Sequence, residues 1–109
     1  MAGLGRDNVK LLMRWDIKPE REQDYFEFVV REWVPGITRL GVEPTGAWYT
    51  AYSQNKRSQI MTEGVADDLE TIRGILASKD WQRLHVRLME YVNNYEQKVV
   101  RVTGDFPVF

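Results

Sequence analysis

Residues 9 to 17, VKLLMRWDI, contain the most restrictive pattern in the chain. Every second residue is large and apolar: Val9, Leu11, Met13 and Trp15. A period of two is typical of a β-strand, in which successive side chains point to opposite faces of a sheet. The pattern therefore predicts a strand with one strongly apolar face. Arg14 and Asp16 share the other face, to which Leu12 adds apolar area.

A helix is predicted after this strand, beginning near Pro19, which suits a first helical turn. Apolar residues recur at i, i+3, i+4 and i+7, as in a buried helical stripe: Phe26, Val29, Val30 and Trp33. Tyr25 and Phe28 fall off this stripe, so we expect them to be exposed or to meet a partner. Pro35 and Gly36 are expected to end the helix.

The next part of the chain predicts a loop and then a β-hairpin. Residues 36–46 contain three glycines and a proline, which is typical of a connecting loop. Residues 47–52 and 58–65 are rich in strand-forming side chains, and the polar residues 53–57 between them predict a turn.

Two helices and a last strand complete the predicted order. Asp67 is the expected N-cap of the first of these helices, with Glu70 at the capping-box position. Ser78 is the expected N-cap of the second, which contains His85. Residues 95–102 are predicted to form the final strand.

The element order is strand, helix, strand, strand, helix pair, strand. This order predicts an α+β fold of the ferredoxin-like, split βαβ type, with a four-stranded antiparallel sheet and helices on one face. The bare face of the sheet carries some apolar area, and a second copy packed against it would cover this area. We therefore expect one domain, residues 1–109, that forms a homodimer through its sheet.

Composition narrows the classes of function. The formal net charge is −1, so no overall charge favours nucleic acid or an anionic membrane. There is no cysteine, which excludes disulfides, thiolate nucleophiles and Cys-based metal sites. No stretch approaches the roughly 20 apolar residues of a membrane helix. We expect a soluble, cytoplasmic protein with no nucleic-acid partner and no membrane contact.

The only histidine lies in the segment SKDWQRLH, residues 78 to 85. His85 follows Trp81 by four residues, so both share one helical face. An imidazole at such a position can ligate a metal or haem, accept a proton, or pack without chemistry. The sequence leaves these alternatives open.

Two segments, REWVPGITRLG and SKDWQRLH, together with the element order, resemble the dimeric α+β barrel superfamily. The resemblance is closest to its antibiotic-biosynthesis-monooxygenase-like and NIPSNAP-like branches and covers roughly residues 8 to 102. It implies that two ferredoxin-like sheets dimerise into an α+β barrel. The superfamily includes cofactor-free monooxygenases, haem-degrading monooxygenases, isomerases and decarboxylases.

The haem-degrading branch bears directly on His85. In those enzymes a histidine on the corresponding helix binds iron, and Ser78, Trp81 and His85 match the spacing of that motif. They also carry a tryptophan ten residues before the histidine, where this chain has Ile75. They carry an asparagine on the first strand, and LLMRWD contains none.

The resemblance implies a protein that binds an apolar or aromatic small molecule in a pocket between helices and sheet. In this interpretation His85 is the catalytic proton acceptor, and substrate is positioned by a second group: Arg14, Trp33, Trp48, Tyr49 and Trp81. We expect no metal and no cofactor. Two alternatives stay open: a non-catalytic homodimeric binding module, and haem binding through His85.

The same residues also have structural interpretations. For Arg14 an ion pair at the sheet edge, with Asp16 or Glu63, is favoured over a substrate contact. The tryptophans are equally explained as core, because aromatic residues at helical or strand spacing commonly pack inside.

Overall fold

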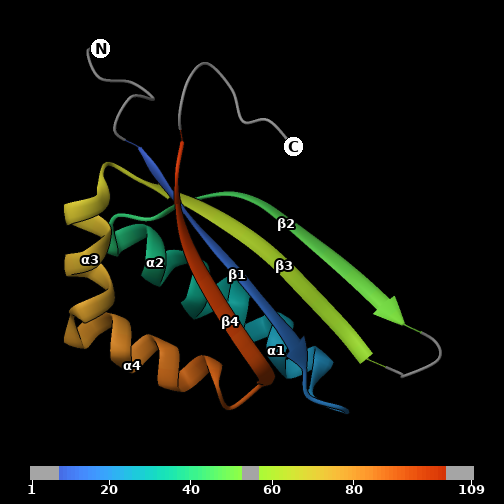
Figure 1. Ribbon diagram of the computed structural model, residues 1–109. Helices are drawn as coiled ribbons and strands as arrows, with labels where there is room; N and C mark the ends of the chain where they lie inside the picture. The colour runs from blue at the N-terminus through green and yellow to red at the C-terminus, as the bar shows by residue number, and fades with distance from the viewer. Residues whose placement is uncertain (1–7, 53–56, 103–109) are drawn as a thin grey trace.

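The computed structural model describes residues 8–52 and 57–102, with residues 48–52 and 57–58 described by their backbone alone (Figure 1). The elements follow in this order: β1 (Val9–Ile17), α1 (Glu22–Phe28), the π-helical turn η1 (Val29–Trp33), α2 (Val34–Leu40), β2 (Glu43–Tyr52), β3 (Arg57–Ala66), α3 (Leu69–Ala77), α4 (Lys79–Leu88) and β4 (Val92–Arg101). No helix within these described ranges is long and apolar enough to cross a membrane.

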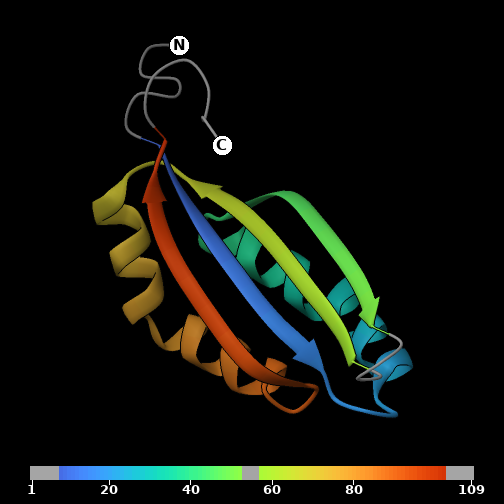
Figure 2. The ribbon, with the colours of Figure 1, turned by 45° about the vertical axis from the view of Figure 1, so that its right-hand side comes forward.

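The strands form one antiparallel sheet in the order β2-β3-β1-β4. β1 lies in the interior of the sheet and pairs with β3 along its whole length. Its pairing with β4 shifts register between Arg14 and Asp16, which marks a bulge. All helices lie on one side of the sheet (Figures 1 and 2). The predicted ferredoxin-like α+β fold is confirmed.

The core lies between the sheet and the helices. The alternation that predicted β1 is confirmed, because every second residue of this strand is buried: Val9, Leu11, Met13, Trp15 and Ile17. The helices contribute a matching set: Tyr25, Phe28, Trp33, Ile37, Ile72, Ile75, Trp81 and Leu88. One face of β1 therefore holds the centre of the fold, as its sequence pattern requires.

The predicted stripe of the first helix is correct for Trp33, which is buried, and for Val29, which packs against the core, but wrong for its other two members. Phe26 is 43% exposed and Val30 is 71% exposed, whereas Tyr25 and Phe28, expected to be exposed or to meet a partner, are buried. The cause is η1, in which the Val34 N–H donates to the Val29 carbonyl, a π-type i to i+5 bond. The turn spaces the buried aromatics Phe28 and Trp33 five residues apart, so a constant α-helical period assigns the wrong face.

The helix also continues beyond Pro35 and Gly36, contrary to prediction. Pro35 lies at the start of α2, where a missing N–H is tolerated. The helix ends at Gly41, whose φ of 113° is the left-handed conformation that favours glycine. Residues 36–46 are therefore not a loop, because α2 extends to Leu40 and β2 begins at Glu43.

The later boundaries agree more closely with the predictions. Asp68 rather than Asp67 is the N-cap of α3, since its carboxylate accepts a bond from the Thr71 N–H at 2.7 Å. Ser78 caps α4 as predicted, with its Oγ 3.1 Å from the Trp81 nitrogen. All three later strands are present, each shifted or extended by a few residues, and residues 53–56 of the predicted turn lie outside the described ranges.

Candidate functional site

His85 lies on α4 and faces the last strand of the sheet. Its ring stacks on Trp81, one helical turn earlier, with 5.9 Å between centroids. It meets the ring of Tyr95 edge to face, with 4.5 Å between centroids. Partial burial lowers the pKa of His85 below its ordinary value, because desolvation disfavours the charged form. The imidazole is therefore neutral at pH 7 and able to accept a proton.

His85 belongs to a closed circuit of aromatic rings. Trp15 contacts Trp33 at 5.8 Å, Trp33 contacts Trp81 at 5.6 Å, and Tyr95 returns to Trp15 at 5.7 Å between centroids. The two contacts of His85 complete the circuit. Its three tryptophans are buried, whereas His85 and Tyr95 are half-buried. The tryptophan side of the circuit is therefore part of the packed core, whereas the side formed by His85 and Tyr95 is accessible to solvent.

A hydrogen bond fixes the centre of this circuit. The Trp15 Nε1 donates to the Tyr25 hydroxyl at 2.9 Å, so both buried polar tips have a partner. Burial raises the pKa of Tyr25, which keeps its hydroxyl neutral. Three of the predicted site residues, Trp33, Trp81 and His85, lie together in this circuit. Trp15 and Tyr95 were not predicted for this site.

Arg14 lies on the opposite side of the sheet from His85. Its guanidinium pairs with Glu96 of β4, which neighbours β1 in register. The prediction that Asp16 or Glu63 pairs with Arg14 is therefore wrong. Glu63 instead binds Lys10 at 3.3 Å, and Asp16 accepts a bond from the Asn94 amide at 2.8 Å. His85 is not among the residues that line the hollow at Arg14.

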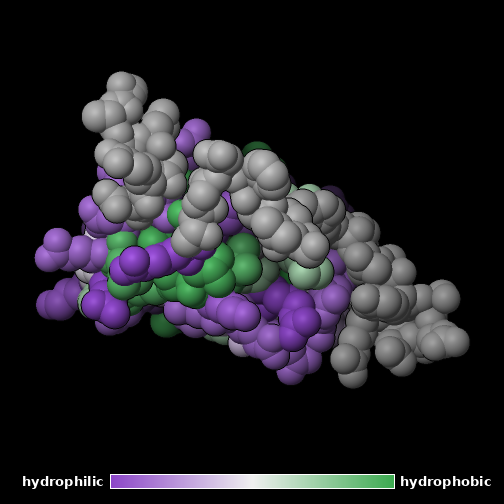
Figure 3. Space-filling model, turned by 45° about the horizontal axis from the view of Figure 1, so that its top comes forward, coloured by the Kyte–Doolittle hydropathy of each residue, from purple (hydrophilic) through white to green (hydrophobic). Residues whose placement is uncertain are grey.

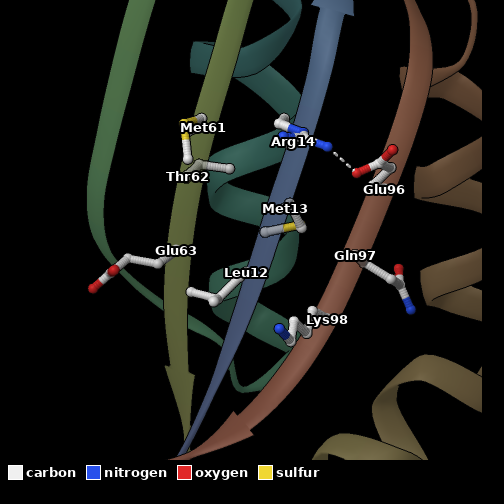
Figure 4. A pocket seen from close by; sticks show the side chains of 9 residues that line it. All are labelled: Leu12, Met13, Arg14, Met61, Thr62, Glu63, Glu96, Gln97 and Lys98. Carbon is white, nitrogen blue, oxygen red and sulfur yellow. Dashed lines mark hydrogen bonds and ion pairs between the residues drawn. The ribbon is translucent and has the colours of Figure 1, made fainter. Parts of the chain in front are cut away.

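Arg14 lines a concavity of about 750 Å³ on the sheet face that the helices leave uncovered (Figure 4). We call this face the open face. The residues lining the concavity come from three strands: Leu12, Met13 and Arg14 of β1, Met61, Thr62 and Glu63 of β3, and Glu96, Gln97 and Lys98 of β4. Its floor combines apolar side chains with charged ones of both signs. This is the composition of a surface that excludes some water while keeping polar groups for orientation.

The two remaining predicted site residues lie on β2. The backbone register pairs Trp48 with Met61 and Tyr49 with Ile60. Their side chains lie outside the described part of the structure, so their role in binding stays a prediction.

No metal centre is found in the described ranges. No group of three or more His, Cys, Asp or Glu residues in residues 8–52 and 57–102 is arranged to hold an ion.

Comparison with known proteins gives a fold and no closer relationship. No protein-family model matches the chain, and no curated protein matches it in sequence. Among solved structures, a NIPSNAP family protein from Agrobacterium tumefaciens superposes with a TM-score of 0.63 at 18% identity, covering 90% of this chain and 88% of that chain. A NIPSNAP-like domain protein from Burkholderia xenovorans gives a TM-score of 0.65 at 15% identity, with 94% and 93% covered.

The name of a third similar solved structure states an enzymatic activity. SnoaB from Streptomyces nogalater, a cofactor-independent oxygenase, superposes with a TM-score of 0.63 at 16% identity, covering 94% of this chain and 99% of that chain. Identities this low establish architecture alone. They confirm the resemblance at the level of the fold: this chain has the α+β fold shared by NIPSNAP family proteins and monooxygenase-like proteins such as SnoaB.

Proposed function

We propose that this protein is a homodimer that binds a small apolar or aromatic molecule at the open face of its sheet. The observation that carries the proposal is the concavity of about 750 Å³ around Arg14. Small-molecule sites are typically hollows of roughly 300–1,000 Å³ with an apolar lining and a few polar groups. The sequence had suggested a pocket between the helices and the sheet. We place the site on the open face instead, because Trp33 and Trp81 pack ring against ring in the space between helices and sheet.

Exposed apolar side chains support association of two copies through this face. Met61 is 48% exposed, and Leu12 is half-buried beside it. The surface also carries hydrophobic side chains in a continuous area between hydrophilic ones (Figure 3). Apolar area of this kind marks interaction surfaces. A second sheet packed face to face would cover the open face and close the concavity into a chamber.

The charges of the open face suit a twofold arrangement. Glu63 and Lys98 lie on either side of Leu12 in the strand register. In an isologous dimer each patch meets its own copy, so Lys98 of one protomer is placed to meet Glu63 of the other. Such complementarity fixes the register of association more than its strength.

Arg14 supplies the polar contact for the ligand. Its guanidinium presents several donors in a fixed plane, a geometry that matches the oxygen of a phenolate or carboxylate. Glu96 already orients this side chain, so less freedom is lost when a ligand binds.

A titration with 1-naphthol tests this proposal, since the probe joins an apolar body to one ionisable oxygen. We expect saturable binding, seen in the fluorescence of the probe, that weakens about tenfold in Arg14→Gln. Arg31→Gln removes the same charge from an exposed side chain of η1 and should leave the affinity unchanged. Equal affinities in the two variants would contradict a site at Arg14.

A second candidate function is cofactor-independent oxygenation at His85, the chemistry that the name of SnoaB states for that protein. The observation that favours it is a neutral, half-buried imidazole at the accessible edge of an aromatic circuit. His85 would accept a proton from an acidic C–H of the substrate. The resulting carbanion would reduce O₂, so that a CH₂ group becomes a carbonyl and the other oxygen atom leaves as water.

Oxygen uptake with anthrone tests this second candidate, because anthrone has an acidic CH₂ between two aromatic rings. We expect uptake above the uncatalysed rate that falls about 100-fold in His85→Gln. The pH profile of the wild type should rise through a pKa below 6.5 and then level off. Uptake that survives in His85→Gln would eliminate this mechanism.

No observation on the described residues favours haem ligation by His85, because its imidazole is already in contact with the rings of Trp81 and Tyr95.

A further inference from the structure

A second hollow of about 550 Å³ lies in the helix layer, between α2 and α4. We call it the α2–α4 groove. It shares no lining residue with the concavity on the open face. A proposal for one of these sites can therefore be tested without reference to the other.

The floor of the α2–α4 groove is apolar. Gly36 lies so close to α4 that a Cβ atom at this position would be 2.7 Å from Leu84 Cδ2. Leu40 and Leu84 are half-buried and pack against the core. The close approach of the helices at Gly36 therefore leaves leucine side chains to line the bottom of the groove.

The rim carries three arginines and two carboxylates. Arg87 of α4 binds Glu32 of η1 through Nη2 at 2.7 Å and Nε at 3.3 Å, and the pair raises the pKa of Arg87. Arg83 pairs with Asp80 of its own helix. Both carboxylates are therefore already engaged by an arginine.

Arg39 is the remaining cation of the rim. It is exposed, and no hydrogen bond or ion pair joins it to any residue in the described ranges. Its donors are free at the edge of an apolar floor. The adjoining π turn η1, which carries Glu32, is a type of turn found frequently at functional sites.

We propose that the α2–α4 groove binds a small organic anion, a carboxylate or phosphate joined to an apolar body. Arg39 holds the anionic head, since a guanidinium matches carboxylate and phosphate oxygens in a two-pronged geometry. Leu40 and Leu84 contact the apolar body. Arg83 and Arg87 are paired with Asp80 and Glu32, so the net positive charge of the rim rests on Arg39. The volume of the groove lies in the range of small-molecule sites.

The experiment is a titration of the full chain with octanoate, followed by amide and arginine side-chain NMR shifts. We expect saturable binding, with the largest shifts in α2 and α4 and at the Arg39 Nε–H. Acetate provides the head alone and 1-octanol the body alone. Each should bind at least about tenfold more weakly than octanoate, because each makes half of the contacts.

A pair of charge-matched variants locates the site. Arg39→Gln should weaken octanoate binding about tenfold. Arg73→Gln removes an equally exposed charge from α3, outside the groove, and should change the affinity less than about twofold. The proposal is overturned if the two variants behave alike, if 1-octanol binds as well as octanoate, or if the shifts cluster on β1, β3 and β4.

Discussion

The two faces of the sheet differ sharply although they are built by alternate residues of the same strands. Trp15 is 1% exposed and contacts three aromatic rings. Its neighbour Arg14 is 48% exposed and makes an ion pair across strands. The covered face stabilises the fold through packing, whereas the open face contributes little to the stability of one copy. A surface that the fold does not need is available for a partner or a ligand.

The largest effect should come from removing Trp15. We expect Trp15→Ala to lower the free energy of unfolding by about 3–5 kcal/mol, because it opens a cavity and leaves Tyr25 without its hydrogen bond. Arg14→Ala, one residue away, should change it by less than about 1 kcal/mol. Urea unfolding followed by far-UV circular dichroism measures both. Similar losses of unfolding free energy in the two variants would show that the open face stabilises the fold as much as the covered face does.

A charge exchange tests the open face directly. Lys98→Glu and Glu63→Lys should each weaken self-association about tenfold, because like charges then face one another between protomers. The double variant should restore the affinity to within about threefold of wild type. Sedimentation velocity over a dilution series measures the dissociation constant. A double variant as weak as the worse single variant would exclude this pairing.

In the helix layer, alanine substitutions at two glycines should have smaller effects on the free energy of unfolding, and these effects should be opposite in sign. Gly36→Ala should lower the free energy of unfolding by about 1 kcal/mol, because Leu84 must move away from the new methyl group. Gly74→Ala should raise it by about 0.5–1 kcal/mol, since nothing lies within 4 Å and alanine favours a helix. Opposite signs in urea unfolding confirm close packing under Gly36 and open space at Gly74.

The smallest effect concerns the edge of the covered face. The folded-state pKa of His85 is lower than its unfolded value near 6.5, so the unfolded chain binds a proton more readily. The free energy of unfolding should therefore fall as the pH drops through about 6.5, and stay level above it. His85→Gln should remove this component of the slope. A slope unchanged by the substitution would show that the imidazole is fully solvated.

The sequence predicted the sheet better than the helices. The alternation in β1 depends only on which side of a strand each residue occupies, so local pattern determines burial. Part of the first helix was assigned the wrong face because η1 adds a residue to one turn. The amino-acid composition of a segment does not predict a π turn. A single inserted residue changes which side chains meet the core, as Phe26 and Tyr25 show.

The candidate sites depended on information that local patterns do not contain. Trp81 and His85 share a helix, so their spacing was enough to bring them together. Tyr95 reaches His85 only through the packing of α4 on β4, and Arg14 finds Glu96 only through the strand register. Neither distance along the chain nor residue type predicts such a pairing, because both are consequences of tertiary structure.

The most direct test of the central claim is sedimentation equilibrium of the wild-type protein beside Leu12→Asp. We expect a wild-type dimer at micromolar concentration and a folded monomer for Leu12→Asp, because the substitution puts a carboxylate at the centre of the open face. Far-UV circular dichroism confirms that the variant is folded. A monomeric wild type, or a Leu12→Asp protein that still dimerises with wild-type affinity, would contradict association through the open face.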